Sequence, residues 1–324
     1  MYDNASGDET AAIVENIAKN DSRIEYHCRP KNVGLVRNIA YAVRELSTPF
    51  FHILCDDDLV FPGFFELAIS ALDCNSEALL FAGITIRART DGYVVDVPLY
   101  HWRPGLLRPP EALFECIQSG HPDWTGVLFR RQVLTAVGAM DISIGNQFDF
   151  EFLCRITARR IIVASREPCG VLFVHSLSAG LIEADQGRYR PDVVVAHWLK
   201  VAANLNALEG IALKDKEAAR KMILKRARGL LFRRACKAAI AGYPADAKAA
   251  LSMIRESFGH APEALAVALF NTISRGPIRV ALNRTVEAAR ELRANRSRIS
   301  IGRLARVEYQ RAVRRLLGSV ALDS

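Results

Sequence analysis

Apolar and polar positions follow two different patterns along the chain, and the change falls near residue 190. Before that point, short apolar runs of strand length alternate with segments in which apolar residues recur every three or four positions. After it, the helical period continues almost without interruption. Strands alternating with amphipathic helices predict an α/β domain, whereas continuous helical periodicity predicts an all-α region. We therefore expect two units, residues 1–190 and 191–324.

The first unit is expected to contain several strand–helix–strand successions. Helical spacing is found at residues 8–19, 35–46, 63–72, 110–119 and 146–157, and also before Gly138. Strand-like runs are found at residues 23–29, 50–55, 78–86, 93–97, 127–129, 161–164 and 170–174. Strand, helix and strand in succession form a βαβ unit, so we expect a largely parallel sheet. Residues 98–110 hold four prolines and are expected to form a mobile loop.

The second unit is predicted to be helical throughout. Candidate helices cover residues 192–208, 214–241, 244–257, 261–274, 277–295 and 301–317. Glycine and proline residues punctuate them, as at Gly242, Pro244 and Gly259. We expect an all-α region without a solenoid repeat, because no repeat period stands out.

The stretch from Phe50 to Pro62, F-F-H-I-L-C-D-D-D-L-V-F-P, carries the clearest chemical signal. A buried strand would deliver three aspartates to the carboxyl edge of the sheet, where ligands of α/β proteins bind. Because Asp56, Asp57 and Asp58 repel one another, a compensating cation is expected, and hard oxygen ligands favour Mg²⁺ or Mn²⁺. The alternative is a solvated acidic turn in which Asp58 caps the following helix.

Composition places the chain among ordinary globular proteins. Of its 324 residues, 50% are hydrophobic and 24% are charged, which suits two domains with cores of their own. The seven cysteines show no C-x-x-C spacing, so we expect reduced structural thiols and no zinc site. No signal-peptide pattern and no apolar run near ~18 residues is visible, so we expect a cytoplasmic protein.

Charge divides the chain into an acidic and a basic part. Residues 1–213 hold 19 Lys and Arg against 26 Asp and Glu, a net charge of −7, and residues 214–324 hold 24 against 9, a net charge of +15. Residues 221–237 combine seven basic residues with an apolar stripe, so this segment can lie on the inner face of an anionic membrane. The alternative is a helical appendage that packs on the first unit and has a basic solvated side.

Nucleic acid is a rival partner because of this charge, but no helix-turn-helix, zinc or aromatic RNA-binding signature is visible. The acidic first part of the chain would also oppose phosphates. A nucleic-acid-binding protein that acts through the basic helical tail is therefore the less favoured alternative.

Several motifs, taken in order, resemble those of family-2 glycosyltransferases with the GT-A fold. They are Y-D-N-A-S-G-D-E-T, N-V-G-L-V-R-N, C-D-D-D-L-V-F-P, W-T-G-V-L-F-R-R-Q-V-L, F-D-F-E-F-L-C-R and a late His-Ser. The resemblance covers roughly residues 2–180. It implies a Rossmann-like mixed sheet flanked by helices, here followed by an all-α region. It also implies an inverting, metal-assisted transferase for a glycan or lipid-linked acceptor, of the kind that builds cell-surface polysaccharides.

The resemblance further implies roles for individual residues. Asp3 would face the nucleobase, while Arg37 and Asn38 would lie at the donor nucleotide. Asp56 and Asp57 would contact the donor ribose, Asp56 and Asp58 would hold the metal, and His175 would add a ligand or contact the diphosphate.

The catalytic base would be Asp149, with Glu151 as its rival. Acidic residues in a first helical turn are also favoured by the helix dipole, which is the structural alternative for both. Trp124 would either belong to the core or offer a stacking surface to the acceptor sugar.

The chain departs from the family at its N-terminus. Family members begin with a strand, a helix and a second strand that build half of the nucleotide pocket, and the first motif here lies almost at Met1. The start of the protein lies upstream, the gene is truncated, or another element fills the gap. A non-catalytic nucleotide-sugar-binding relative is therefore the alternative to an active glycosyltransferase.

Overall fold

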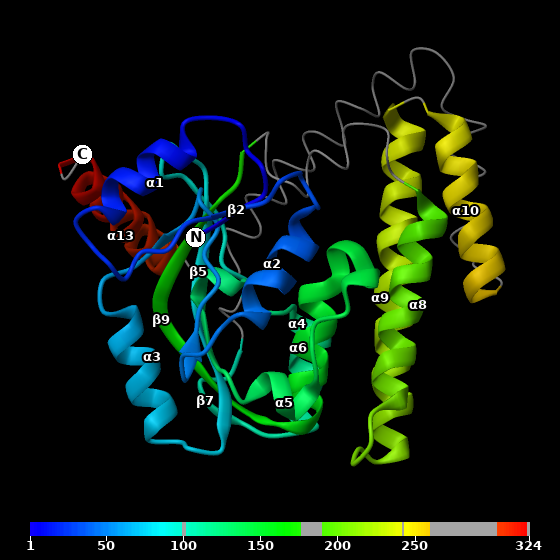
Figure 1. Cartoon of the computed structure of the whole chain (residues 1–324). Coiled ribbons are helices and arrows are strands. Elements are labelled where there is room, and N and C mark those ends of the chain that lie inside the picture. Colours follow the sequence, from blue (N-terminus) through cyan, green and yellow to red (C-terminus); the bar gives the residue numbers. More distant parts are fainter. Residues whose placement is uncertain (99–101, 176–189, 242, 260–302, 323–324) are drawn as a thin grey trace.

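A seven-stranded mixed sheet forms the centre of the computed structural model, which describes residues 1–98, 102–175, 190–241, 243–259 and 303–322 (Figure 1). Its strand order is β3-β8-β5-β9-β4, with β6 beside β5 and β7 beside β9. The strands are β3 (Phe50–Phe51), β4 (Leu59–Val60), β5 (Ala78–Ala88), β6 (Val94–Asp96), β7 (Gly105–Leu107), β8 (Val127–Arg130) and β9 (Ile161–Phe173). The predicted α/β class with a mixed sheet and a helical C-terminal region is confirmed.

The expectation of a largely parallel sheet is wrong. Among the described strands of the large sheet, only β5 and β9 pair in parallel, and the other pairings are antiparallel. A local βαβ unit does exist at the N-terminus, where β1 (Tyr2–Asp3) and β2 (His27–Cys28) pair in parallel around α1 (Thr10–Ala18). In the described part of the chain these two strands pair only with each other. Local periodicity predicts such strands but not their partners.

β5 and β9 are central because both of their faces are covered. The run A-L-L-F-A-G-I-T-I-R-A of β5 is almost wholly buried, as expected of a strand between two neighbours in a covered sheet. Leu80 and Ile84 join the main core cluster, whereas Phe81 joins the cluster under α3. Residues 161–164 and 170–174 were predicted as separate strands, but β9 is one strand through residues 165–169.

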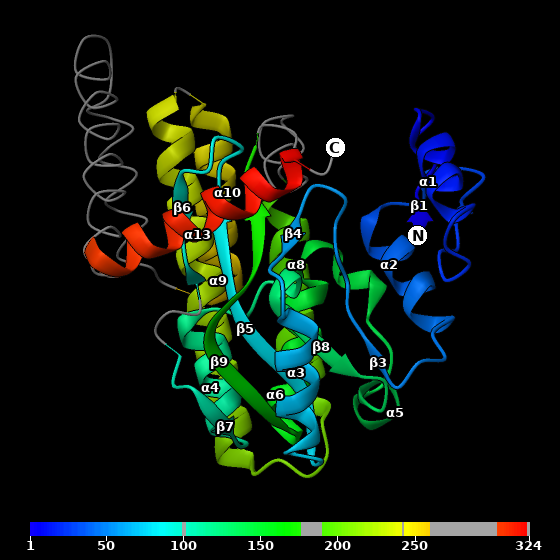
Figure 2. The same cartoon turned by 90° about the vertical axis from the view of Figure 1, so that its left-hand side faces the viewer.

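Helices cover the two faces of the sheet unequally. On one face lies α3 (Phe64–Asp73), which packs its Phe64, Ala68 and Leu72 against the sheet. On the other lie α4 (Glu111–Ser119) and α6 (Phe148–Arg159), with the short α5 (Val133–Val137) beside them (Figure 2). Two 3₁₀ turns, Trp124–Gly126 (η2) and Ile142–Gln147 (η3), connect these elements and carry polar residues of the site.

The C-terminal helices pack outside α4 and α6 as a further layer (Figure 1). α8 (Pro191–Ala207), α9 (Leu213–Ala241) and α10 (Pro244–Phe258) lie side by side. α13 (Arg303–Leu322) returns to the sheet and contacts β6. These four helices match predicted ones, while predicted helices 261–274 and 277–295 lie outside the described residues.

The apolar stripe of α9 is buried inside the protein. Ile223, Ala227, Leu231 and Ala235 are fully buried. The first two join the main core cluster of the α/β part, and Leu231 packs with Val195 of α8 and Ile254 of α10. The stripe is therefore not available to a membrane surface, which favours the interpretation of α9 as a packed appendage. None of the helices in the described ranges combines the length and apolar content needed to cross a membrane.

The segment predicted as an irregular loop at residues 98–110 contains β7, which pairs with β9. Residues 99–101 lie outside the described part of the chain. The prolines allow this strand because β7 itself, Gly105–Leu107, contains none and lies at the edge of the sheet. The prediction of a wholly irregular segment is thus wrong for its second half.

Candidate functional site

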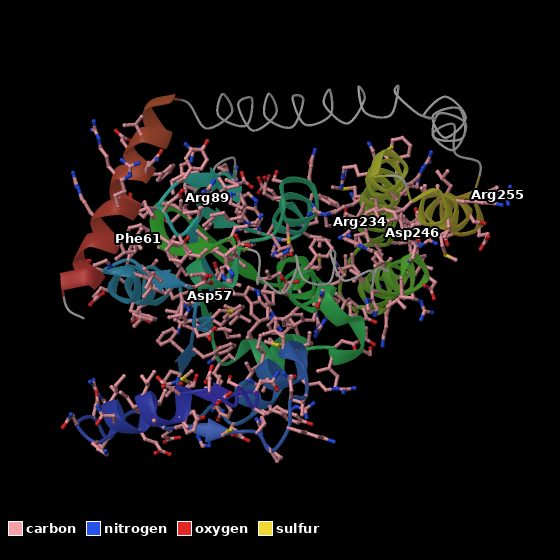
Figure 3. All side chains as sticks on the ribbon, turned by 90° about the horizontal axis from the view of Figure 1, so that it is seen from above. Asp57, Phe61, Arg89, Arg234, Asp246 and Arg255 are labelled. Carbon is pink, nitrogen blue, oxygen red and sulfur yellow. The ribbon has the colours of Figure 1, made fainter. Side chains whose placement is uncertain are left out.

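Asp56, Asp57 and Asp58 lie on the turn between β3 and β4, at one end of the sheet. We call this turn the aspartate turn. The strand before them is shorter than predicted, since β3 ends at Phe51 and pairs with β8 at the sheet's edge. β4 is bound to β9, with Leu59 opposite Val171, and this pairing holds the turn next to the end of β9. Asp57 lies on the side of the sheet that faces the N-terminal elements α1 and β1 (Figure 3).

Asp58 is the buried member of the group, whereas Asp56 and Asp57 are exposed. Its Oδ2 accepts a hydrogen bond of 2.7 Å from the Thr125 hydroxyl, and its Oδ1 accepts one of 3.1 Å from the backbone N–H of Phe173. Burial raises the pKa of Asp58 to about 6 although both hydrogen bonds lower it. A positive charge beside this carboxylate would restore its ionised form.

Cys55, Asp57 and Asp58 bring one possible ligand atom each to within 4.8 Å of one another. Burial of the sulfur, together with the charges of Asp58, Asp57 and Asp56, raises the pKa of the Cys55 thiol to about 12. A protonated thiol is a poor ligand, so the two carboxylates are the groups that fit a hard divalent cation. Asp56, one of the predicted ligands, is not part of this group.

His175 follows β9 and contacts the aspartate turn. Its Nε2 lies 2.8 Å from Oδ2 of Asp57, where a protonated nitrogen donates to the carboxylate. The ring is outside the group formed by Cys55, Asp57 and Asp58. In this position His175 fixes the orientation of the Asp57 carboxylate.

The segment from His121 to Gly126 connects the aspartate turn to the rest of the site. Asp123 is buried and receives two hydrogen bonds, of 2.8 and 2.7 Å, from Arg87 on β5. Two residues later, the hydroxyl of Thr125 binds Asp58. A Cβ on Gly126 would lie 2.6 Å from Thr85 Oγ1, so only glycine lets this turn approach β5 so closely.

Asp149 lies in the first turn of α6 and is partly exposed. Its Oδ1 accepts a hydrogen bond of 2.6 Å from the N–H of Phe150, while its Oδ2 lies 3.7 Å from Nε2 of His121. One carboxylate oxygen is thus used locally and the other faces a histidine. The segment from His121 to Gly126 therefore touches both ends of the site, at Asp58 and at Asp149.

Glu151, the rival of Asp149, has a different environment. Its side chain is 1% exposed and forms two hydrogen bonds with Arg155, at 2.7 and 2.9 Å. Asn204 on α8 donates a third, of 3.0 Å. Arg155 also binds the backbone carbonyl groups of Val137 and Ala139. Glu151 thus joins α6 to α8 and to the end of α5, which is a structural role.

Asp3 is buried at the end of β1 and is surrounded by donors. Its carboxylate accepts hydrogen bonds from the hydroxyl of Tyr26 at 2.6 Å, and from the hydroxyl and N–H of Ser6 at 2.7 and 2.9 Å. These hydrogen bonds, that of Tyr26 first, hold the pKa of Asp3 below its ordinary value. Asp3 therefore orders the turn after β1.

Asn38 and Arg37 are neighbours on α2 (Leu35–Arg44) but differ in their surroundings. Asn38 is buried, donates to the carbonyl of Tyr2 at 2.7 Å and accepts from Arg29 at 3.3 Å, so it fastens α2 to β1. Arg37 is exposed, and no described residue makes a hydrogen bond or ion pair with its side chain. Only Arg37 of the two has its polar group free for a ligand in this part of the chain.

Trp124 lies in the core. It is 9% exposed and packs edge-on against Phe129, Phe148 and Phe152, with centroid distances of 5.7, 5.2 and 6.3 Å. Its face is thus shared among aromatic neighbours, and the indole N–H has no hydrogen-bond partner among the described residues. Of the two interpretations of Trp124, this packing favours the core.

Sequence reasoning missed the residues that join the site together, namely Arg87, His121, Asp123 and Thr125. Their partners lie 36 residues away for Arg87 with Asp123 and 67 for Thr125 with Asp58, so no local pattern relates them. The available signal was the run H-P-D-W-T-G, which places polar residues between a buried helix and a buried strand.

Residues 1–138 match the family model described as "Glycosyl transferase family 2". A search of curated proteins found no match. Among solved structures, the chain is similar to S. aureus TarS 1-349, with a TM-score of 0.61 at 12% identity over 89% of this chain and 81% of that one. The UDP complex of the same protein gives a TM-score of 0.54 at 12% identity over the same shares. Asp149 and His175 lie beyond the matched residues.

Proposed function

We propose that this chain, whose residues 1–138 form a glycosyltransferase family 2 domain in the GT-A fold, moves a sugar from a nucleoside-diphosphate donor to an acceptor hydroxyl with inversion at the anomeric carbon. The observation that carries the proposal is the connection of the aspartate turn to Asp149 through one segment. In that segment Thr125 binds Asp58 and His121 faces Asp149. A cation-binding end and a base are the two groups that such a transfer needs.

A divalent cation, Mn²⁺ or Mg²⁺, would be held by Asp57 and Asp58, with Asp56 available from the same turn. The fit rests on the hard oxygen donors of Asp57 and Asp58. Burial raises the pKa of Asp58 to about 6, and a cation at its carboxylate would oppose that effect. When bound, the cation would neutralise negative charge on the departing diphosphate. His175 would orient Asp57 through the contact of 2.8 Å.

Asp149 is the proposed base. Its Oδ2 accepts no hydrogen bond from described residues at ordinary length, and its side chain is 30% exposed, so a hydroxyl can reach it. Glu151 is a poorer candidate because its side chain is 1% exposed and both oxygens are bound to Arg155. The acceptor hydroxyl would donate to Asp149 and attack the anomeric carbon opposite the leaving diphosphate.

The donor nucleotide would lie between the aspartate turn and the N-terminal elements. TarS, whose fold is similar, has been solved in complex with UDP, which supports a nucleoside diphosphate as the ligand class. Arg37 would pair with a phosphate, Asp56 and Asp57 would contact the ribose, and Asp3 with Asn38 would shape the base pocket. Asp3 and Asn38 would shape this pocket by ordering the backbone around β1 and α2.

The acceptor is proposed to be a glycan or a lipid-linked sugar. Four basic residues of α9, Arg220, Lys221, Lys225 and Arg233, are exposed and could contact an anionic membrane surface by charge alone. Trp124 would act from the core by supporting the segment that carries His121. Binding to vesicles that contain anionic lipid, without affinity for duplex DNA, is the expected result.

The proposed function is tested with Asp149→Asn. Transfer from a nucleotide-sugar in the presence of Mn²⁺ should fall by at least about 1,000-fold, because the amide cannot accept the proton. Nucleotide binding, followed by thermal shift, should stay within about twofold. Asp73→Asn, at the end of α3, is the matched control and should transfer normally.

Two outcomes would contradict the proposal. If Asp149→Asn lost nucleotide binding together with transfer, Asp149 would be structural. If the wild-type chain bound nucleotides without any transfer or donor hydrolysis, it would be a non-catalytic relative. A panel of nucleoside diphosphates with and without Mn²⁺ identifies the base in either case.

A further inference from the structure

His121 lies just after α4 and has a defined tautomer when neutral. Its Nδ1 is 3.0 Å from the carbonyl oxygen of Pro122. Because a carbonyl oxygen only accepts hydrogen bonds, the proton of a neutral ring lies on Nδ1. The other nitrogen, Nε2, then presents a lone pair, and it is this nitrogen that faces Asp149.

Two acceptors therefore face each other across 3.7 Å, Nε2 of His121 and Oδ2 of Asp149. The other oxygen of Asp149 is already bound to the N–H of Phe150. A separation of 3.7 Å is longer than a hydrogen bond, so the pair needs an outside donor or a proton of its own. Both side chains are partly exposed, 19% for His121 and 30% for Asp149, so a hydroxyl donor can enter.

We propose that His121 is a second catalytic group, which takes over the proton that Asp149 removes from the acceptor hydroxyl; this rests on the proposed function. The oxygen of the acceptor forms a bond to the anomeric carbon, and the bond from that carbon to the diphosphate breaks with its electron pair. The hydroxyl proton passes to Oδ2 of Asp149 and then to Nε2 of His121, once their separation of 3.7 Å shortens to hydrogen-bond distance. The imidazolium formed is paired with the Asp149 carboxylate and gives its proton to water after product release.

The charges around His121 favour a transient imidazolium. Asp149 on α6 is the anion that stabilises it, and Asp123, just before η2, is neutralised by Arg87 on β5. Arg87 also interacts electrostatically with Asp149. From α9, Arg226 lies over the ring of Phe150 at 5.4 Å, and that ring is 5.8 Å from His121. The guanidinium groups of Arg87 and Arg226, which contact Asp123 and the Phe150 ring, favour release of the extra proton afterwards.

Substitution of His121 distinguishes a catalytic role from a structural one. His121→Gln should lower kcat roughly 10- to 100-fold and leave KM for the donor unchanged. The loss is at or below the lower end of what general acid–base catalysis contributes, because Asp149 remains in place. The pH profile of the variant's rate should also differ from that of the wild-type chain, because glutamine has no ring nitrogen that can accept a proton. His27→Gln is the matched control, since His27 lies 3.2 Å from Glu25 on an exposed surface and should transfer normally.

Rescue and spectroscopy complete the test. Added imidazole should restore part of the activity of His121→Ala and none of that of Asp149→Asn. Histidine ¹⁵N spectra of the full chain, with the signal assigned by its loss in His121→Gln, should report the Nδ1–H tautomer near pH 8. A His121→Gln variant with wild-type kcat and pH profile, a loss without imidazole rescue, or an Nε2–H tautomer would overturn the inference while Asp149 keeps its role. A wild-type chain that transfers no sugar overturns the proposed function itself and this inference with it.

Discussion

Thr125 and Asp58 are joined by a hydrogen bond of 2.7 Å between the threonine hydroxyl and Oδ2 of the aspartate, across 67 residues of sequence. Both side chains are buried, at 4% and 7% exposure. The bond fixes the aspartate turn to the segment that also carries His121 and Asp123. The two chemical ends of the proposed site are therefore held by one short piece of chain.

Removing the Thr125 hydroxyl should weaken the cation site. Thr125→Val keeps the shape of the side chain but leaves one oxygen of Asp58 without its donor, and loss of such an outer contact typically costs about 10- to 100-fold in metal affinity. Isothermal titration with Mn²⁺ measures this. Thr135→Val is the control, because the Thr135 hydroxyl donates to the carbonyl of Gln132 on the exposed side of α5. Equal Mn²⁺ affinity in both variants would contradict a cation site at Asp58.

Glu151→Gln should act on stability. The substitution leaves Arg155 buried without its counter-charge, which is expected to lower the free energy of unfolding by about 3 kcal/mol. Urea unfolding of the full chain measures it, and Glu111→Gln in the exposed pair with Arg103 should cost less than about 1 kcal/mol. Transfer by the folded Glu151→Gln protein should stay near the wild-type rate. Lost transfer at unchanged stability would instead make Glu151 the base.

Local sequence patterns predicted the helices well, because the apolar residues that form the helical pattern are the same residues that the helix buries. In α9, Ile223, Ala227 and Leu231 are spaced by four, and all three are buried. The same patterns gave only the approximate positions of strands. The apolar run after Phe50 predicted a buried strand of six residues, but strand length depends on hydrogen-bond partners, and β3 finds one partner, β8, for two residues.

The site shows the same division. The aspartate turn was predicted from the sequence, since three adjacent carboxylates repel one another and indicate a compensating cation. The roles of Glu151 and Trp124 depend on contacts with Arg155 and with three phenylalanines, which tertiary packing alone creates. The same holds for His121, whose facing carboxylate, that of Asp149, is 28 positions away in the sequence.

Asp141 should make stability dependent on pH in the acid range. Burial raises its pKa, but hydrogen bonds from Ser143, Asn204 and Lys200 outweigh burial and lower the pKa to about 2. A carboxyl whose folded pKa is depressed stabilises the protein above its unfolded pKa, near ~3.9, and loses this contribution as the pH falls towards the folded value. Asp141→Asn should therefore have a lower Tm than wild type at pH 7, and the difference should shrink from pH 4 to pH 2. A difference independent of pH would show that the charge of Asp141 contributes nothing.

Gly126→Ala should disturb both ends of the site at once. The added Cβ would meet Thr85 Oγ1 at 2.6 Å and the carbonyl oxygen of Gly83 at 2.9 Å, so the η2 turn must move away from β5. Such overpacking is expected to cost about 1–3 kcal/mol in stability. The displacement also lengthens the bond of Thr125 to Asp58, so both Mn²⁺ affinity and transfer should fall. Gly229→Ala within α9 is the matched control, since its Cβ meets only Arg233 Nη1 at 3.5 Å and alanine favours the helix. That control should be slightly more stable than wild type and fully active, and a Gly126→Ala protein with wild-type Tm and Mn²⁺ affinity would contradict the close approach of η2 to β5.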